Sequence, residues 1–230
     1  MTTADLRRPA PGSVPPATTG TLDWLAGGCR LTRLYLVSRR VPMALVLLVG
    51  LGTLLGVALH QHWNIAGGPA ARHFIPLTIQ SGAAAVIAVT TYGPFGEPER
   101  AAGRWLPWLR LGEAVALTAV AFGALAAGAA AGEMPGGSLA LLRNFGGMVG
   151  IGLLSAVVLG GAFGWVGPMA YLLIAEGALA HRSATPWIWP ARPPHDRGAA
   201  ICACLVIAAG LVLITVRGPR ESGRESGPAS

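Results

Sequence analysis

The sequence predicts an all-α, polytopic membrane protein with six transmembrane helices and an N-terminal amphipathic interfacial helix. Its 230 residues are 53% hydrophobic and only 12% charged, about half the charged fraction of an ordinary soluble domain. The apolar stretches are about 20 residues long, which is enough to cross a hydrocarbon core. The tryptophans all fall where these stretches meet polar sequence, as expected for side chains at a water–lipid interface.

All 17 basic residues are arginines, and the sequence contains no lysine. In a soluble protein the formal charge of +7 would point toward nucleic acid. In a membrane protein, however, arginine gathers at cytoplasmic helix ends, and we expect no nucleic-acid partner. A phosphate-binding loop of the G-x-x-x-x-G-K-[ST] kind needs a lysine, so any ATP hydrolysis must take place on another chain. The arginine, alanine and glycine bias is typical of a GC-rich bacterial gene.

The first 40 residues precede the apolar stretches. Residues 1–22 are polar and proline-rich, which predicts a disordered cytoplasmic tail. Residues 24–40 predict a helix in the headgroup plane, because its apolar and basic side chains occupy opposite arcs. A solvated basic segment is the alternative. The apolar arc holds Trp24, Leu31, Leu34 and Tyr35, and the basic side holds Arg30, Arg33 and Arg40.

Residues 23–216 are expected to form one membrane domain. The six spans are predicted at 41–59, 74–92, 111–131, 144–161, 165–180 and 199–216. The first span, at about 1.5 Å per residue, reaches roughly 28 Å, close to the thickness of the hydrocarbon core. Spans four and five are separated only by residues 160–164. One continuous helix there would overshoot the bilayer, so we expect a tight glycine turn. Residues 217–230 predict a second disordered cytoplasmic tail.

Arginine placement orients these spans. With the N-terminus inside, most arginines fall in the inner segments, and the positive-inside rule therefore places both termini in the cytoplasm. The expected location is the bacterial plasma membrane, crossed several times. The outer segments hold only Arg72, Arg143, Arg182, Arg192 and Arg197.

The link between spans two and three is the most distinctive cytoplasmic segment. Pro98 suits the first position of a helix, and we expect a short helix over 97–106 that Pro107 terminates. Two acids lie at its positive N-terminal end, and two arginines follow on one face. This helix either docks on a partner or is a charged connector that only sets topology. The four charged residues are Glu97, Glu99, Arg100 and Arg104.

This layout resembles the permease subunits of ATP-binding-cassette exporters of the type-two class. The stretches 142–150 (LRNFGGMVG) and 187–196 (WIWPARPPHD) are similar to actinobacterial members. The resemblance covers about residues 24–216, and it lies in layout more than in motif. It implies that 24–40 is a connecting helix and that 97–106 is a coupling helix.

The same resemblance implies partners. Glu97, Glu99, Arg100 and Arg104 would face a cytoplasmic ATPase subunit. A second permease copy or a sister permease would complete a dimer in the lipid bilayer. Residues 181–197 would form an outer cap with short re-entrant turns. No cofactor is implied.

Two acids lie within the spans. Glu176 is in the outer half of span five, and an acid at membrane depth is a candidate for the substrate pathway. It could meet a cationic substrate, pair with an arginine such as Arg143, or be a structural carboxylate. Glu113 lies one turn from Arg110, which favours a local ion pair.

No metal site is expected. His60, His62 and His73 surround a single loop, as solvated histidines do, and Cys202 and Cys204 lie inside an apolar span, as small packing residues do. Glycines four residues apart permit close helix contacts, either within one subunit or between subunits. These pairs are Gly52 and Gly56, Gly128 and Gly132, Gly146 and Gly150, and Gly160 and Gly164.

These expectations together favour the transmembrane subunit of an ATP-driven exporter. It would move a peptide, antibiotic, lipid or polysaccharide-like substrate outward and would have no catalytic residue of its own. A membrane scaffold or immunity protein that transports nothing is the alternative. A polytopic enzyme acting on lipid or quinone is disfavoured, because no polar residues converge at one membrane depth.

Overall fold

The computed structural model describes residues 41–61, 71–91, 106–132, 134, 136–181 and 185–218. All of them belong to the unit Val37–Ser230. The predicted tails and the predicted interfacial helix at 24–40 lie outside the described residues, apart from the first two residues of the C-terminal tail. The helices are α2 (Val41–His60), α3 (Ala71–Thr90), α5 (Leu106–Ala129), α6 (Gly137–Leu159), α7 (Val166–Ala180) and α8 (Arg197–Arg217). Two short 3-10 helices are η2 (Gly161–Phe163) and η3 (Trp189–Ala191).

Six segments are long and apolar enough to cross a membrane, which confirms the predicted number among the residues that the structure describes. Five of them correspond to α2, α3, α5, α6 and α8. The sixth joins η2 to α7 as Gly161–Ala180, because α7 alone is shorter than a bilayer requires. The described part of the chain is all-helical, and the protein is a multi-pass membrane protein.

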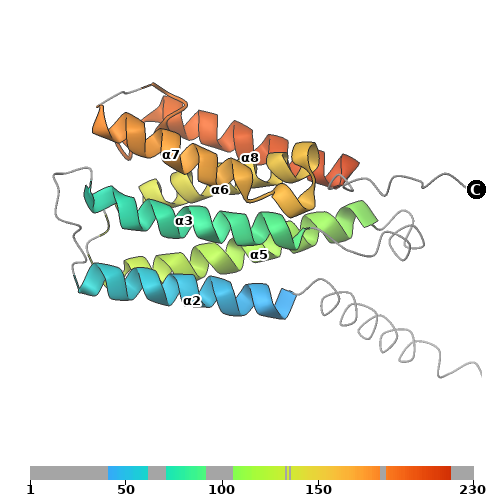
Figure 1. Cartoon of the computed structure of the whole chain (residues 1–230), viewed down its shortest axis with the longest axis horizontal. Helices are drawn as coiled ribbons and strands as arrows, with labels where there is room; N and C mark the ends of the chain where they lie inside the picture. Colours follow the sequence, from blue (N-terminus) through green and yellow to red (C-terminus); the bar gives the residue numbers. More distant parts are fainter. Residues whose placement is uncertain are drawn as a thin grey trace, which may run out of the picture. The chain divides into compact units, whose positions relative to one another are not determined.

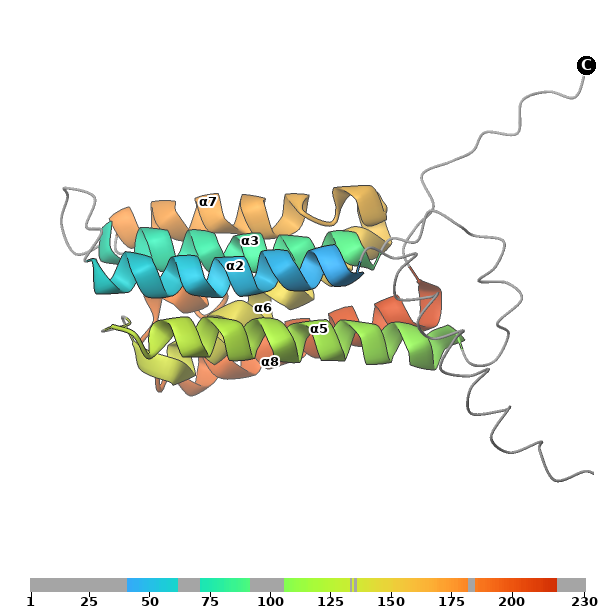
Figure 2. The ribbon, with the colours of Figure 1, turned by 90° about the horizontal axis from the view of Figure 1, so that it is seen from below.

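The six helices run alternately in opposite directions (Figure 1). Figure 2 shows α2, α3 and α7 side by side, with α5 and α8 on the other side and α6 between. α6 is the central helix, since 67% of its apolar span is buried. We call the end where α7 finishes and α8 begins the cap end. The opposite end is where α2 begins and α8 finishes.

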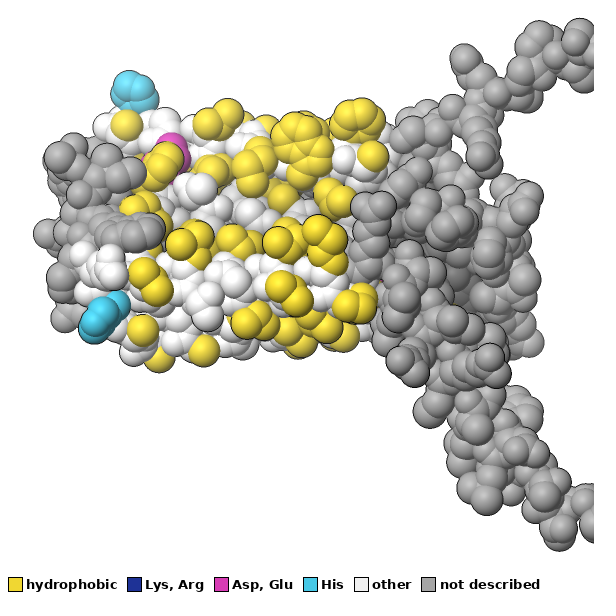
Figure 3. Space-filling view, turned by 60° about the horizontal axis from the view of Figure 1, so that its bottom comes forward, with side chains coloured by type: hydrophobic (Ala, Val, Ile, Leu, Met, Phe, Trp, Pro, Cys, Tyr) yellow, Lys and Arg dark blue, Asp and Glu magenta, His cyan; other side chains and the backbone are white. Residues whose placement is uncertain are grey.

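The outward-facing side chains are those that lipid would solvate. Large apolar side chains are exposed along several helices, among them Met43, Val46, Leu173, Leu205 and Val216. Figure 3 shows one side of the unit covered by hydrophobic side chains, backbone and uncharged side chains, with histidine and acidic side chains only toward the cap end. Such a surface is expected of a protein whose surroundings are hydrocarbon rather than water.

Glycines bring two pairs of parallel helices into backbone contact. A Cβ atom at Gly52 would lie 2.5 Å from the carbonyl oxygen of Ala124, and one at Gly128 would overlap the carbonyl of Gly52. α2 and α5 therefore pack at a distance that only glycine permits. A Cβ atom at Gly150 would lie 2.6 Å from the Ile207 backbone, and so α6 and α8 approach equally closely. These glycine positions thus pack within the subunit.

The turn between α6 and α7 is built by glycine, as predicted. Gly160 has a φ of 104°, in the left-handed region that an L side chain rarely adopts. η2 follows directly and redirects the chain into α7. Helix continuity is broken here, and two antiparallel spans form instead of one long helix.

One predicted boundary was wrong. α6 begins at Gly137 rather than at residue 144, because apolar residues precede Arg143 and carry that arginine into the helix. Pro107 occupies the first turn of α5, which starts at Leu106. A proline is tolerated there because the amide it lacks would have no intrahelical partner. The predicted helix over 97–106 lies outside the described residues apart from Leu106.

Candidate functional site

The four charged residues predicted to face an ATPase lie outside the described residues. The residues that flank their segment are placed: α3 finishes at Thr90 and α5 begins at Leu106. Both are at the opposite end of the bundle, together with Val41 and Arg217 (Figure 1). The segment 92–105 thus leaves and re-enters the bundle at the end that also holds the first and last residues of the six helices.

A folded segment occupies the cap end. We call residues 185–196 the cap segment; η3 forms its centre. Ile188, Trp189 and Pro190 are buried, where η3 packs against α6, α7 and α8. The cap segment therefore contains a short helical turn that lies between three spans, within the range predicted as a cap; that this end faces outward stays a prediction.

Arg143 connects this cap segment to the central helix. Its side chain is 7% exposed. The guanidinium donates hydrogen bonds to the carbonyl oxygens of Pro193 at 2.6 Å, Trp189 at 2.7 Å and Arg192 at 3.0 Å. Its Nε atom also donates to Oδ1 of Asn144 at 3.3 Å. The planar fork of arginine suits such a set of fixed acceptors, so Arg143 holds three carbonyls of the cap segment at once.

An aromatic stack supports the same segment. The rings of Tyr171 and Trp189 lie 4.6 Å apart at an interplanar angle of 26°, a stacked arrangement that adds to simple burial. The Tyr171 hydroxyl donates to the Trp187 carbonyl at 3.0 Å. The Trp189 ring also packs against Gly147, where any side chain would overlap it. The prediction that every tryptophan lies in an interfacial belt was wrong for Trp189, which is 2% exposed.

Asp196 joins the cap segment to α8. Its Oδ1 atom accepts a hydrogen bond from the Ala199 amide at 2.8 Å, which caps the helix. Its Oδ2 atom pairs with the Arg192 guanidinium at 2.6 Å. The Ala199 amide, and then the Arg192 hydrogen bond and the nearby positive charges, lower the pKa of Asp196 below its ordinary value. The carboxylate is therefore held in its charged form.

Glu176 lies on α7, within a turn of the cap end. Its side chain is partly exposed, and its Oε1 atom is buried with no hydrogen-bond partner among the described residues. The considered pairing with Arg143 is not made, because the Arg143 guanidinium is occupied by the cap carbonyls. A carboxyl group at membrane depth without such a partner stays a candidate for contact with substrate.

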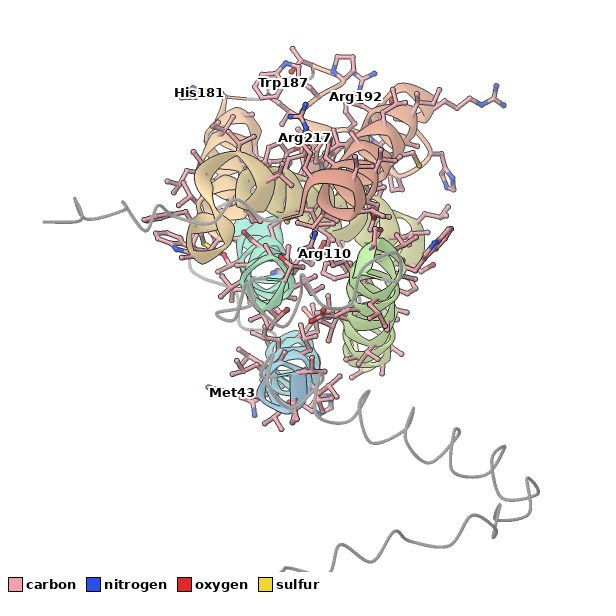
Figure 4. All side chains as sticks on the ribbon, turned by 90° about the vertical axis from the view of Figure 1, so that its right-hand side faces the viewer. Met43, Arg110, His181, Trp187, Arg192 and Arg217 are labelled. Carbon is pink, nitrogen blue, oxygen red and sulfur yellow. The ribbon has the colours of Figure 1, made fainter. Side chains whose placement is uncertain are left out.

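Arg110 lies at the opposite end of the bundle. Figure 4 shows its side chain directed inward between the helices, whereas Met43 is directed outward. A Cβ atom at Gly218 would overlap the Arg110 guanidinium, so Arg110 packs against the residue that follows α8. Glu113, one turn along α5, is buried. Arg110 thus connects the start of α5 with the end of α8.

Sequence reasoning missed two polar groups inside α3. Gln80 and Ser81 are fully buried. The Ser81 hydroxyl donates to the Pro168 carbonyl at 2.9 Å, which joins α3 to α7. Both side-chain polar atoms of Gln80 have no hydrogen-bond partner among the described residues. The signal was the pair of adjacent polar residues in an otherwise apolar stretch, and such residues face the bundle interior rather than lipid.

Among the described residues, no three His, Cys, Asp or Glu side chains gather closely enough to hold a metal ion.

Comparison of the chain with family models, curated proteins and solved structures finds no match in any of the three.

Proposed function

We propose that this chain is the transmembrane subunit of an ATP-driven exporter, in which a separate ATPase subunit binds near residues 97–104. The observation that carries the proposal is the arrangement of the two ends of the bundle. The charged segment between α3 and α5 leaves the bundle beside Val41 and Arg217, and the packed cap segment lies at the other end.

This arrangement supports transmission of motion. A partner that pulls on segment 92–105 would act on the ends of α3 and α5, the two helices that flank it. α5 packs against α2 through glycine backbones, and α3 packs against the central α6. A rigid movement at one end would therefore tilt several spans together, as shear between packed helices does. The absence of lysine from the sequence supports placing ATP hydrolysis on the partner.

Glu176 is the proposed contact for substrate in this scheme. It lies near the cap end, where a substrate would leave, and its carboxyl group is not used to hold the cap segment. A cationic group on the substrate would meet it there. Replacing Glu176 with Gln should then reduce transport without detaching the ATPase, which transport assays and co-purification measure separately.

The experiment that tests the proposal is a mild-detergent pull-down of the tagged protein from its native cells. The eluate is assayed for ATP hydrolysis. The test variant replaces Glu97, Glu99, Arg100 and Arg104 with Gln. The matched control replaces Arg197 and Arg217, exposed arginines at the two ends of α8.

The proposal expects an ATPase to co-purify with the unmodified protein and with the control, and to be lost from the test variant while insertion is retained. Transport at the normal rate by the test variant would contradict the coupling role. A pure preparation without ATPase would contradict the exporter and favour a membrane scaffold or immunity protein.

A further inference from the structure

An apolar groove of about 770 Å³ runs along the outside of the α2–α5 pair. Along α2 it extends from Val49 to His60 and the following Gln61, and along α5 from Val120 into the following turn at Ala131. This volume is within the usual range for small-molecule sites. Neither the cap segment nor the proposed ATPase contact takes part in it.

The groove exists because its floor lacks side chains. Gly52 and Gly128 bring the two backbones together, so main-chain atoms form the floor in place of interleaved side chains. Gly123 also lines it, and a Cβ atom there would meet nothing within 4 Å. A flexible apolar chain lying in the groove would contact both helices at once. Such van der Waals contact is what drives association inside lipid, where the hydrophobic effect is absent.

The length of the groove identifies its occupant. From Val49 to His60 at 1.5 Å per residue is about 17 Å, slightly more than half of a 30 Å hydrocarbon core. Val49 lies near the middle of α2, and His60 is its last residue. The groove thus covers the depth of a single leaflet, from the midplane to the headgroups at the cap end.

A helix of a second copy fits this shape poorly. A transmembrane helix crosses both leaflets, but the groove stops at the midplane. A helix about 10 Å wide and 17 Å long also has a volume of about 1,300 Å³, so it would rest on the rim instead of filling the groove. The outer end is polar, because the exposed His60 imidazole and Gln61 amide lie where α2 finishes. A groove that is apolar along its length and polar at one end suits a ligand with an apolar chain and a polar headgroup.

We propose that the groove binds one acyl chain of a phospholipid from the leaflet at the cap end, with its headgroup beside His60. The site goes beyond the exporter proposal and does not depend on it, since binding here requires neither an ATPase nor transport.

Photolabelling in proteoliposomes of phosphatidylethanolamine and phosphatidylglycerol tests this site. Two phosphatidylglycerol probes carry a diazirine, one at the end of an acyl chain and one close to the headgroup. Labelled peptides are identified by mass spectrometry. The chain-end probe should label near Val49 and Val120, and the headgroup probe should label near His60 and Ala131.

Two variants of α5 provide the matched comparison. Gly123→Leu fills the groove, and Gly112→Leu places the same side chain on the same helix outside it, where a Cβ atom also meets nothing within 4 Å. Labelling of the groove should fall to the level of other helix faces in the first variant and stay unchanged in the second.

Uniform labelling around all six helices, or labelling without the depth order of the two probes, would overturn the proposal even if Gly123→Leu failed to fold. Groove labelling that persists in a folded Gly123→Leu protein would overturn it too. So would disulfide bonds between copies carrying Val49→Cys, if they form where the lipid adducts are missing.

Discussion

Arg143 shows how a single charged residue is accommodated inside this membrane domain. A buried guanidinium needs acceptors, and three carbonyl oxygens of the cap segment accept hydrogen bonds from it. Two of these carbonyls also accept backbone amides, that of Trp189 from Arg192 and that of Pro193 from Asp196, each at 3.1 Å. The guanidinium therefore adds a second hydrogen bond to each of them, and without the cap segment the buried guanidinium would lose these acceptors.

Replacing Arg143 with Leu should destabilise the protein by about 2–4 kcal/mol, because its charge-assisted hydrogen bonds to the cap segment are lost. Arg143→Lys should recover only part of this, since an ammonium lacks the planar fork. Thermal unfolding in nanodiscs and protease cleavage within residues 185–196 measure the effect. Arg197→Leu is the control, because Arg197 is exposed at the start of α8. An unchanged unfolding temperature for Arg143→Leu would contradict the structural role.

Asp196 gives the cap segment a pH dependence. Its pKa is lowered in the folded protein, so its stabilising effect is complete above the ordinary aspartate pKa of about 3.9. The effect is lost as pH falls below about 4 and the folded carboxylate takes up a proton. The unfolding temperature should therefore drop in that range. Asp196→Asn still caps α8 but cannot titrate, so the unfolding temperature of this variant should change less with pH. The same pH dependence of the unfolding temperature in both proteins would refute the role of Asp196.

At the scale of helices, the glycine pairs determine which elements pack most closely. The sequence shows small residues at four-residue spacing, but that spacing leaves the partner helix open. The structure pairs Gly52 with Gly128 and brings Gly150 against Ile207, both between parallel helices. Contact between backbones replaces interleaved side chains there, so even a methyl group is too large.

Gly128→Ala should therefore destabilise the α2–α5 pair by about 1–3 kcal/mol, a usual cost of overpacking. Gly123→Ala should be neutral or slightly stabilising, because its Cβ atom meets nothing within 4 Å and alanine favours helix over glycine. Thermal unfolding and monodispersity on size-exclusion chromatography compare the two variants. Equal stability of both variants would show that the close contact is absent.

At the scale of the whole membrane domain, an even number of alternating helices places Val41 and Arg217 at one end. The link between α3 and α5 returns to that end, and the cap segment lies at the other. The alternation of helix directions alone determines which segments share an end of the bundle. The arginine distribution predicts which end is cytoplasmic.

Single cysteines introduced into a cysteine-free protein test this topology. Ala101→Cys and Ser222→Cys should react with a membrane-impermeant maleimide from one side only. His195→Cys, in the exposed part of the cap segment, should react from the other side. In intact cells only the His195 position should be labelled, according to the predicted orientation. Labelling of Ser222→Cys and His195→Cys from the same side would refute the six-span arrangement.

Part of the candidate site could be predicted from sequence. An acid in an apolar span identifies Glu176 as a candidate, and the cap was expected only from the resemblance in layout to exporter permeases. The role of Arg143 could not be found, because arginine counting treats it as a loop residue. Its acceptors are main-chain carbonyls about 50 residues away, which have no sequence signal. The buried Trp189 was missed for a similar reason: an interfacial tryptophan and one inserted between helices have the same apolar neighbours along the chain.

The sequence by itself determined the class of protein, the number of spans and the turn at Gly160, because length, hydropathy and glycine conformation are local properties. Only the tertiary structure decided which glycines meet, that Arg143 holds the cap segment, and that an apolar groove lies between α2 and α5. Those features depend on the rotation of each helix about its axis and on contacts between distant residues. Helices that are apolar on all sides leave that rotation undetermined until they pack.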